Sequence, residues 1–212
     1  MSRRRNPTIS PRKQPQQARS AGLIAAALEA AVQVLAKEGA QRFTMARVAE
    51  RAGVSVGSLY QYFPNKAAIL FRLQSDEWQQ TTALLRQILE ERQRTPLERL
   101  RRLVHAFVRS ECDEAQMRTA LSDAAPLYRH APEARQVRLS SARTIQVFML
   151  EVLPKASEST RVLAGDLLKT TLSSVAKQFS ESPHSPAEIE AYADAMADMF
   201  CAWLRVLRRA RS

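Results

Sequence analysis

The stretch FTMARVAERAGVSVGSLYQYFPNK, residues 43–66, constrains the fold more than any other part of the chain. Thr44 is a good N-cap, and apolar residues follow it at helical spacing, at Met45, Val48 and Ala49. This pattern predicts a helix of about seven residues that ends at residue 51 or 52. Gly53 comes next and suits a backbone with positive φ, so we expect the chain to turn sharply there.

A second short helix is predicted beyond this turn, with Ser55 as its cap. Leu59 and Phe63 share one face of that helix, while Ser55, Ser58 and Tyr62 share another. The proline that follows ends it. Two short helices joined by a tight glycine turn form the helix-turn-helix pattern, whose second helix enters the DNA major groove.

Helices this short are not stable alone, so they need a neighbour to pack against. The apolar residues upstream predict it: a helix over about residues 18–38, with Gly39 as its C-cap. Its stripe comprises Leu23, Ile24, Ala27, Leu28, Ala31, Val34 and Leu35.

The predicted recognition helix carries several features that suit DNA. Gly57 lets the backbone approach the duplex closely, and Tyr60 and Tyr62 offer hydroxyl groups to phosphates or bases. Asn65 and Lys66 begin the next helix, whose positive dipole end and ammonium group suit a phosphate. No Arg, Asn or Gln is expected on the groove-facing side of the recognition helix, so bidentate base reading is not predicted.

Positive charge is concentrated at the start of the chain. Of the net charge of +11, residues 1–66 contribute +8, from eleven Lys or Arg against three acids, and the remainder contributes +3. Such an excess favours a polyanionic partner. Residues 1–17, rich in Arg, Pro, Gln and Ser, are predicted to be a disordered basic arm. This arm is either a solvated tail or an extension that contacts the minor groove or phosphates.

Other classes of protein find little support in the sequence. No apolar run approaches the roughly 18 residues of a membrane span, and no secretory signal is recognisable, so we expect a cytoplasmic protein without a membrane partner. Cys112 and Cys201 form no metal-binding or CxxC pattern. Catalytic motifs are missing and the three histidines lack metal-ligand spacing, so we expect no enzyme, no metal and no cofactor.

After residue 66 the chain reads as a second helical region. A long helix follows the Pro64 junction, and Thr95 starts another that reaches about Cys112. We expect a shorter helix within 113–131, a long helix from Pro132 to residue 152, and one over 158–180. A second capping box at 185–188 then opens a last helix with a broad apolar stripe.

The segment TMARVAERAGVSVGSLYQYFPNKAAIL resembles the DNA-binding domain of the TetR (tetracycline-repressor-like) family of bacterial regulators, over about residues 18–70. This resemblance implies an all-α protein with an N-terminal three-helix helix-turn-helix domain, residues 18–66, and a C-terminal effector-binding and dimerisation domain, residues 67–212. It implies a homodimer that binds a palindromic operator in double-stranded DNA, usually as a repressor, and leaves it when a small-molecule effector binds. The DNA-contacting positions carried over by the resemblance are Thr44, Ser55, Val56, Gly57, Ser58, Tyr60, Tyr62 and Lys66.

In the same family the effector pocket lies among the middle helices of the C-terminal domain, and the last two helices pair with those of a second subunit. The pocket candidates of suitable chemistry are Trp78, His105, Phe107, Met117, Tyr128, Phe148 and Met149. Their apolar bulk favours a hydrophobic or aromatic ligand. The interface candidates on the last helix are Tyr192, Met196, Met199 and Trp203. The alternative interpretation of the whole chain is a basic architectural protein that binds nucleic acid without sequence preference.

Overall fold

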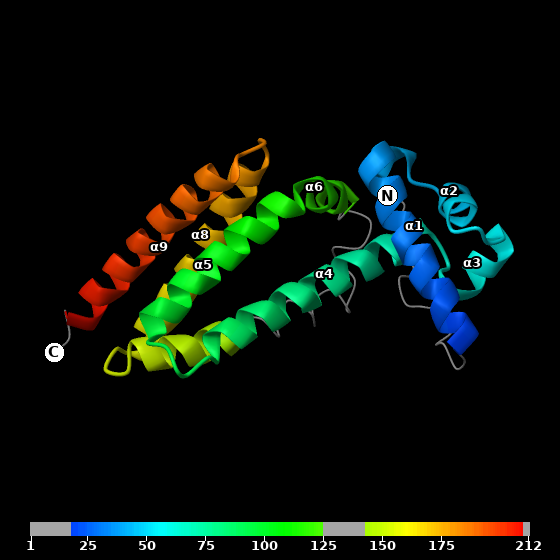
Figure 1. Cartoon of the computed structure of the whole chain (residues 1–212). Coiled ribbons are helices and arrows are strands. Elements are labelled where there is room, and N and C mark those ends of the chain that lie inside the picture. The colour runs from blue at the N-terminus through cyan, green and yellow to red at the C-terminus, as the bar shows by residue number, and fades with distance from the viewer. Residues whose placement is uncertain (1–17, 125–142, 210–212) are drawn as a thin grey trace, which may run out of the picture. The chain divides into compact units, whose positions relative to one another are not determined.

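The computed structural model describes residues 18–124 and 143–209, and within these ranges it contains helices and no strand. The helices, labelled in Figure 1, are α1 (Ala18–Arg42), α2 (Met45–Arg51), α3 (Val56–Tyr62), α4 (Lys66–Leu89), α5 (Pro96–Asp113), α6 (Ala115–Ala124), a helix over 143–152, α8 (Glu158–Ser180) and α9 (Pro186–Arg209). The all-α fold class is therefore confirmed. The predicted arm at 1–17, the end of the 113–131 helix and the start of the Pro132 helix lie outside the described residues.

Helix starts follow the predicted caps. The Thr44 hydroxyl accepts a hydrogen bond from the Arg47 amide at 3.3 Å, and the Ser55 hydroxyl accepts one from the Ser58 amide at 3.0 Å. At α5, Thr95 and Glu98 form a complete capping box with Pro96 in the first turn. Local side chains therefore satisfy amide groups that a helix start leaves unpaired.

Two glycines with positive φ interrupt the N-terminal helices where the sequence predicts breaks. Gly39, with φ 73 and ψ 172, is non-helical, so the regular part of α1 stops at Glu38 as expected. Gly53 has φ 67 and directs the chain from α2 into α3. Both values fall in the left-handed region, which an L-residue with a Cβ adopts at a cost.

The chain forms two compact units. The first contains the described residues up to Trp78 and those of α6 from Gln116, and the second contains residues 79–115 and the helices from 143 onward. The units divide α4 between them, whereas the predicted domain boundary falls at its start. That functional division stays a prediction.

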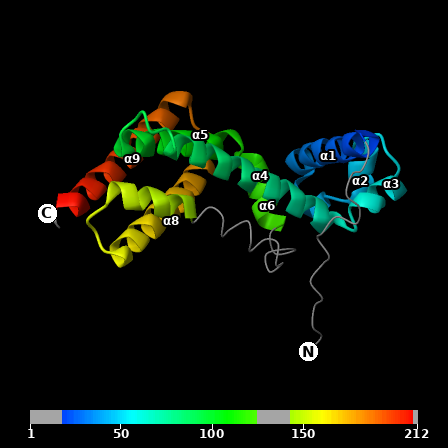
Figure 2. The ribbon, with the colours of Figure 1, turned by 90° about the horizontal axis from the view of Figure 1, so that it is seen from below.

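In the first unit, α1 packs against α2, and α2 packs against α3 (Figures 1 and 2). The predicted stripe of α1 supplies core residues such as Ala27, Ala31 and Leu35, and Leu59 of α3 is fully buried against them. Contrary to the expectation that no segment approaches a membrane span, Ser20–Arg42 has a mean hydropathy of 1.4 and sufficient length. Its apolar face forms the core of this unit, which accounts for that composition without a membrane.

In the second unit, α5 lies alongside α8 and α9, and the two views agree on this arrangement (Figures 1 and 2). The shared core draws on these three helices and on the helix over 143–152; its largest fully buried side chains are Leu100, Leu103, Met149, Leu153 and Leu168. Cys201 is buried in this core and Cys112 is half-buried. Burial raises the pKa of both thiols, so they stay protonated at neutral pH.

Candidate nucleic-acid interface

The outer face of α3 is open to solvent. Val56 is 38% exposed and Tyr60 is 42% exposed, and Gly57 lies exposed between them in sequence. Ser55 is exposed at the start of the helix, whereas Ser58 is half-buried. A short helix that rests on a core through one face and leaves the other open has the geometry needed to enter a groove.

The Ser55 and Ser58 hydroxyl groups form a local pair. Their oxygens are 2.8 Å apart, and the Ser55 oxygen also accepts from the Ser58 amide. The pair fixes the first turn of α3 and leaves hydroxyl groups at the rim of its open face. Such groups can donate to or accept from phosphates and base edges.

Tyr62 is placed differently from its prediction. Its side chain is only 9% exposed and belongs to the core of the first unit with Leu59 and Phe63. The expectation that Tyr62 shares an open face with Ser55 and Ser58 is wrong, because the Tyr62 side of α3 packs into the core of the first unit. The aromatic ring of Tyr62 packs in the core, whereas the sequence predicted that it would face DNA.

Gln61 is a further candidate for DNA contact, which the sequence patterns did not single out. It is exposed on α3, four residues after Gly57, and so lies on the same face as Gly57 and Tyr60. The expectation that this face carries no Gln is therefore wrong. Spacing from Gly57 was the signal that could have found it. Gln is one of the side chains that can bond adenine through two groups.

Thr44 and Lys66 flank the helix-turn-helix. Thr44 is exposed at the start of α2, with its hydroxyl in the capping hydrogen bond, and Lys66 is half-buried in the first turn of α4. Asn65 caps α4, since its side-chain oxygen accepts from the Ala68 amide at 3.0 Å. The amide-rich start of α4 and the ammonium of Lys66 therefore lie together, which suits a phosphate.

The arginines of α2 are held by α1. Arg47 forms an ion pair with Glu38, and the Arg51 guanidinium donates to the Gln33 side chain at 2.5 Å. Both arginines remain exposed to solvent. Their contacts join α2 to α1, and so help to hold the orientation of the helix-turn-helix on its supporting helix.

The described effector candidates are divided between the two units. Trp78 and Met117 belong to the first unit, while Phe148 and Met149 are buried in the core of the second. Phe107 is half-buried on that second core, and Tyr128 lies outside the described residues. The sequence shows which residue types suit a ligand, but it does not show which of these side chains lie close together in the fold.

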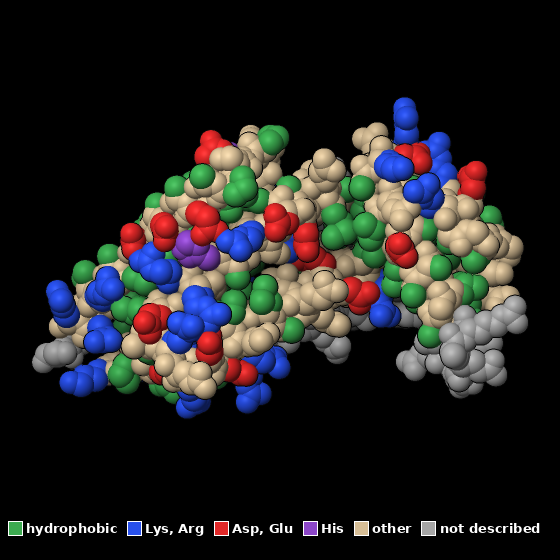
Figure 3. Space-filling model, in the orientation of Figure 1, with side chains coloured by type: hydrophobic (Ala, Val, Ile, Leu, Met, Phe, Trp, Pro, Cys, Tyr) green, Lys and Arg blue, Asp and Glu red, His purple; other side chains and the backbone are tan. Residues whose placement is uncertain are grey.

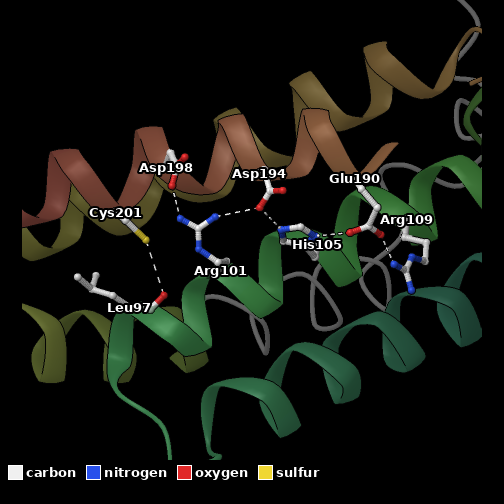
Figure 4. A network of polar contacts seen from close by, with 8 residues as sticks. All are labelled: Leu97, Arg101, His105, Arg109, Glu190, Asp194, Asp198 and Cys201. Carbon is white, nitrogen blue, oxygen red and sulfur yellow. Dashed lines mark hydrogen bonds and ion pairs between the residues drawn. The ribbon is translucent and has the colours of Figure 1, made fainter. Parts of the chain in front are cut away.

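His105, the remaining candidate, lies in a row of ion pairs between α5 and α9 (Figure 4). Its Nδ1 and Nε2 are each 3.0 Å from a carboxylate oxygen, of Glu190 and Asp194 respectively. Arg109 also pairs with Glu190, and Arg101 bridges Asp194 and Asp198. In Figure 3, acidic and basic side chains gather around a histidine over these helices.

His105, Arg101 and Asp194 of this row also line a cavity of about 1000 Å³ together with residues of α4, so a ligand role for His105 stays a prediction. The hydrogen bond from Arg109, and then that with His105, holds the pKa of Glu190 below its ordinary value. Both ring nitrogens of His105 already face carboxylates, so the ring joins α5 to α9.

The interface candidates on α9 fall into two groups. Met196 is buried in the core of its own unit, and Tyr192 stacks on Phe179 with ring centroids 3.9 Å apart. Met199 is 52% exposed, and Trp203 is half-buried. Further exposed apolar side chains on the two last helices are Val162, Leu163, Leu167 and Val206.

Two family models match the chain. One, described as bacterial regulatory proteins of the tetR family, matches residues 27–73, which include α2 and α3. The other, described as the tetracyclin repressor-like C-terminal domain, matches residues 95–207, more than half of the 212 residues. No curated protein matches the chain in sequence.

Solved structures share the fold over most of their length. FadR of Bacillus halodurans, a fatty acid degradation regulator, is 20% identical with a TM-score of 0.65, covering 91% of this chain and 99% of that one. PfmR, a TetR family transcriptional regulator of Thermus thermophilus, is 21% identical with a TM-score of 0.65, covering 83% and 97%. NalD of Pseudomonas aeruginosa, the secondary repressor of the MexAB-OprM multidrug efflux pump, is 17% identical with a TM-score of 0.58, covering 89% and 96%.

Proposed function

Because this chain belongs to the TetR family and is a DNA-binding transcriptional regulator, we propose that it represses transcription as a homodimer on a palindromic operator and is released by a small, largely apolar effector. The observation that carries the proposal is the open face of α3, whose opposite face packs into the core of the first unit. A cytoplasmic location follows from contact with chromosomal DNA.

The open face of α3 offers specific contacts to a major groove. Val56 suits a thymine methyl group, and Gln61 can bond adenine through its amide. Tyr60 and the Ser55–Ser58 pair can reach bases or phosphates. Thr44 and Lys66 then contact phosphates on either side of the helix-turn-helix, which positions α3 without reading sequence. Tyr62 contributes by packing, with at most its hydroxyl reaching the backbone.

Gly57 supports close approach of DNA. Its φ is not positive, and an added Cβ would meet only the Ser55 hydroxyl oxygen, at 3.8 Å, which is an ordinary contact. The fold of the described chain therefore gives no reason for glycine at this position. A duplex backbone or base edge lying against α3 would supply one.

Dimerisation is supported by the apolar side chains that α8 and α9 leave exposed. Leu163 and Leu167 on α8 are 65% and 49% exposed, and Met199 and Val206 on α9 are 52% and 61% exposed. Several large apolar side chains open to water on two neighbouring helices are typical of a surface that another subunit covers. One helix-turn-helix reads few base pairs, whereas two related by a twofold axis read a palindrome.

Release by an effector is supported by the family and by the names of its relatives. The structures of similar fold include a regulator of fatty acid degradation and a repressor of a multidrug efflux pump. A small molecule of largely apolar character is accordingly proposed here.

The test is protection and affinity on DNA. Fragments from around the gene's own promoter are footprinted, and the protected sequence is compared with random DNA of equal length by fluorescence anisotropy. We expect an affinity ratio of about 10³ or more and an inverted repeat under the footprint. A ratio near one, with a steep salt dependence for both fragments, would instead favour the architectural alternative.

A further inference from the structure

A basic pocket lies in the second unit, where the C-terminal end of α4, α5 and the helix over 143–152 meet. Its volume is about 320 Å³, which is large enough for a small ligand. Its apolar lining residues are Leu89, Val147 and Phe148. The remaining walls are mostly charged, so the pocket pairs an apolar surface with polar groups.

Positive charge predominates in these walls. Arg86, Arg92, Arg99 and Arg143 face only two acids, Glu90 and Glu151. Among the described residues, the guanidinium groups of Arg86, Arg92 and Arg143 form no ion pair or hydrogen bond. Exposed arginines elsewhere in this unit, such as Arg101, Arg102 and Arg109, do have acidic partners.

Arg99 is the buried member of the set. It is 2% exposed, its guanidinium lies over the Phe148 ring at 5.8 Å from the centroid, and it bonds the Leu89 carbonyl and Glu151. Its Nε is buried without a hydrogen-bond partner. Buried donors in proteins are nearly always paired, so an orphaned one in the wall of a pocket points to a missing acceptor.

Glu151 does not neutralise the pocket. It is the only acid there that pairs with Arg99 in the described ranges, and its side chain remains 44% exposed. Within the described part of the chain, an entering anion would meet the guanidinium groups of Arg86, Arg92 and Arg143 without acidic partners, and such groups bind carboxylates and phosphates in paired, planar geometry.

We propose that this pocket is the effector site and that its ligand is a small amphipathic anion. The anionic headgroup, a carboxylate or a phosphate, is held by Arg92 and Arg143, and the apolar part lies against Leu89, Val147 and Phe148. This inference rests on the proposed effector response and adds a charge requirement to it. The ligand joins α4, α5 and the helix over 143–152, since each contributes lining residues.

The experiment is isothermal titration of the full chain, without DNA, with octanoate, octyl phosphate and the neutral octanamide. At least one anion is expected to bind, with affinity at least about tenfold above that of octanamide. The double variant Arg92→Gln/Arg143→Gln should weaken that anion by about tenfold or more, because both residues are exposed and the fold does not need them. The better of the two anions identifies the headgroup.

A matched control removes the same charge elsewhere. Arg205 and Arg209 on α9 are exposed and do not line the pocket, so Arg205→Gln/Arg209→Gln should bind the anion as the natural sequence does. The site is refuted if neither anion binds, if octanamide binds equally well, or if the control loses as much affinity.

The assignment of the pocket as the effector site is tested separately, by adding the anion that binds in the titration to the protein–operator complex. Operator release supports the effector assignment. Unchanged operator binding refutes that assignment, and failure of the protein to bind any operator is a failure of the proposed function instead.

Discussion

Gly53 has a conformational requirement that comes from the backbone alone. Its φ is 67, yet a Cβ built there would meet no atom within 4 Å. We therefore expect Gly53→Ala to destabilise the protein by about 1–2 kcal/mol, the cost of a left-handed L-residue, with no steric contribution. Urea unfolding followed by circular dichroism measures this. Gly22→Ala is the control, since Gly22 lies inside α1 with negative φ and open space, and should stabilise by about 0.5–1 kcal/mol. Equal shifts of one sign would contradict the argument.

Gly57 should respond in the opposite way. Its Cβ position is uncrowded and it lies within α3, so Gly57→Ala should leave the free energy of unfolding unchanged or slightly raised. DNA affinity should fall by about tenfold or more, because the added methyl group lies on the face proposed to touch the duplex. Anisotropy on the footprinted operator, alongside urea unfolding, measures both. Undiminished operator affinity would remove the argument for close approach at this glycine.

Tyr60 and Tyr62 separate DNA contact from packing within one helix. Tyr60 is 42% exposed, so Tyr60→Ala should change the unfolding free energy by less than about 0.5 kcal/mol and weaken operator binding by about 1–3 kcal/mol. Tyr62 is 9% exposed and in the core, so Tyr62→Ala should cost about 3–5 kcal/mol of stability. Urea unfolding and operator titration of both variants test the pair. Exchanged outcomes would mean that the faces of α3 are wrongly assigned.

The capping boxes make the helix starts sensitive to acid. Thr95 donates to the Glu98 carboxylate through its hydroxyl and its amide, both at 2.8 Å, and these bonds hold the pKa of Glu98 below its ordinary value. A lowered folded-state pKa means that the stabilisation is complete above the pKa of the unfolded chain. It is lost as the pH falls through the lowered pKa of the folded state.

Glu98→Gln tests this dependence. Because the amide carries no charge to lose, the difference in unfolding free energy between the natural sequence and Glu98→Gln should be largest near about pH 7 and shrink toward about pH 3. Urea unfolding across this range measures it. Thr95→Ala removes the largest cause of the pKa shift and should reduce the same dependence. If the difference in unfolding free energy between the natural sequence and Glu98→Gln grew as the pH fell, the predicted direction of the pH dependence would be wrong.

Helix boundaries were predictable because caps and turns are local. Thr44, Ser55, Thr95 and Ser185 each bond an amide three residues on, an interaction that spacing alone reveals. The faces of α3 were not predictable in the same way. Spacing shows that residues share a face, but which face the core of the unit covers depends on tertiary packing. Spacing alone therefore did not reveal that Tyr62 is buried and that Gln61 is exposed.

Across the second unit, the contacts that could not be predicted are those between residues far apart in sequence. The two carboxylates that His105 contacts come from α9, some 85 and 89 residues away. The basic pocket likewise draws on residues 86–92, 99 and 143–151, a grouping that no local pattern discloses. The apolar bulk of the sequence candidates suggested an apolar ligand, whereas the walls of the basic pocket also contain arginines.

The proposed dimer rests on apolar side chains that one copy of the chain leaves exposed. We expect Leu167→Glu and Met199→Glu to shift the protein from dimer to monomer, because each places a charge on an apolar surface proposed to be buried between subunits. Both side chains are about half exposed already, at 49% and 52%, so the subunit itself should stay folded. Sedimentation equilibrium measures mass, and circular dichroism checks helix content.

Leu150→Glu is the matched control. Leu150 is 54% exposed but lies on the helix over 143–152, outside the α8 and α9 surface, so this variant should remain dimeric. Operator binding should depend on the oligomeric state. A monomeric variant keeps its own α3 but has no second subunit to contact the second half-site, so it should bind the full palindrome no better than a single half-site. If Leu150→Glu dissociates the dimer and the other two variants do not, the interface lies on the helix over 143–152 and not on α8 and α9. If full operator affinity survives in a monomer, the twofold reading of the palindrome must be abandoned.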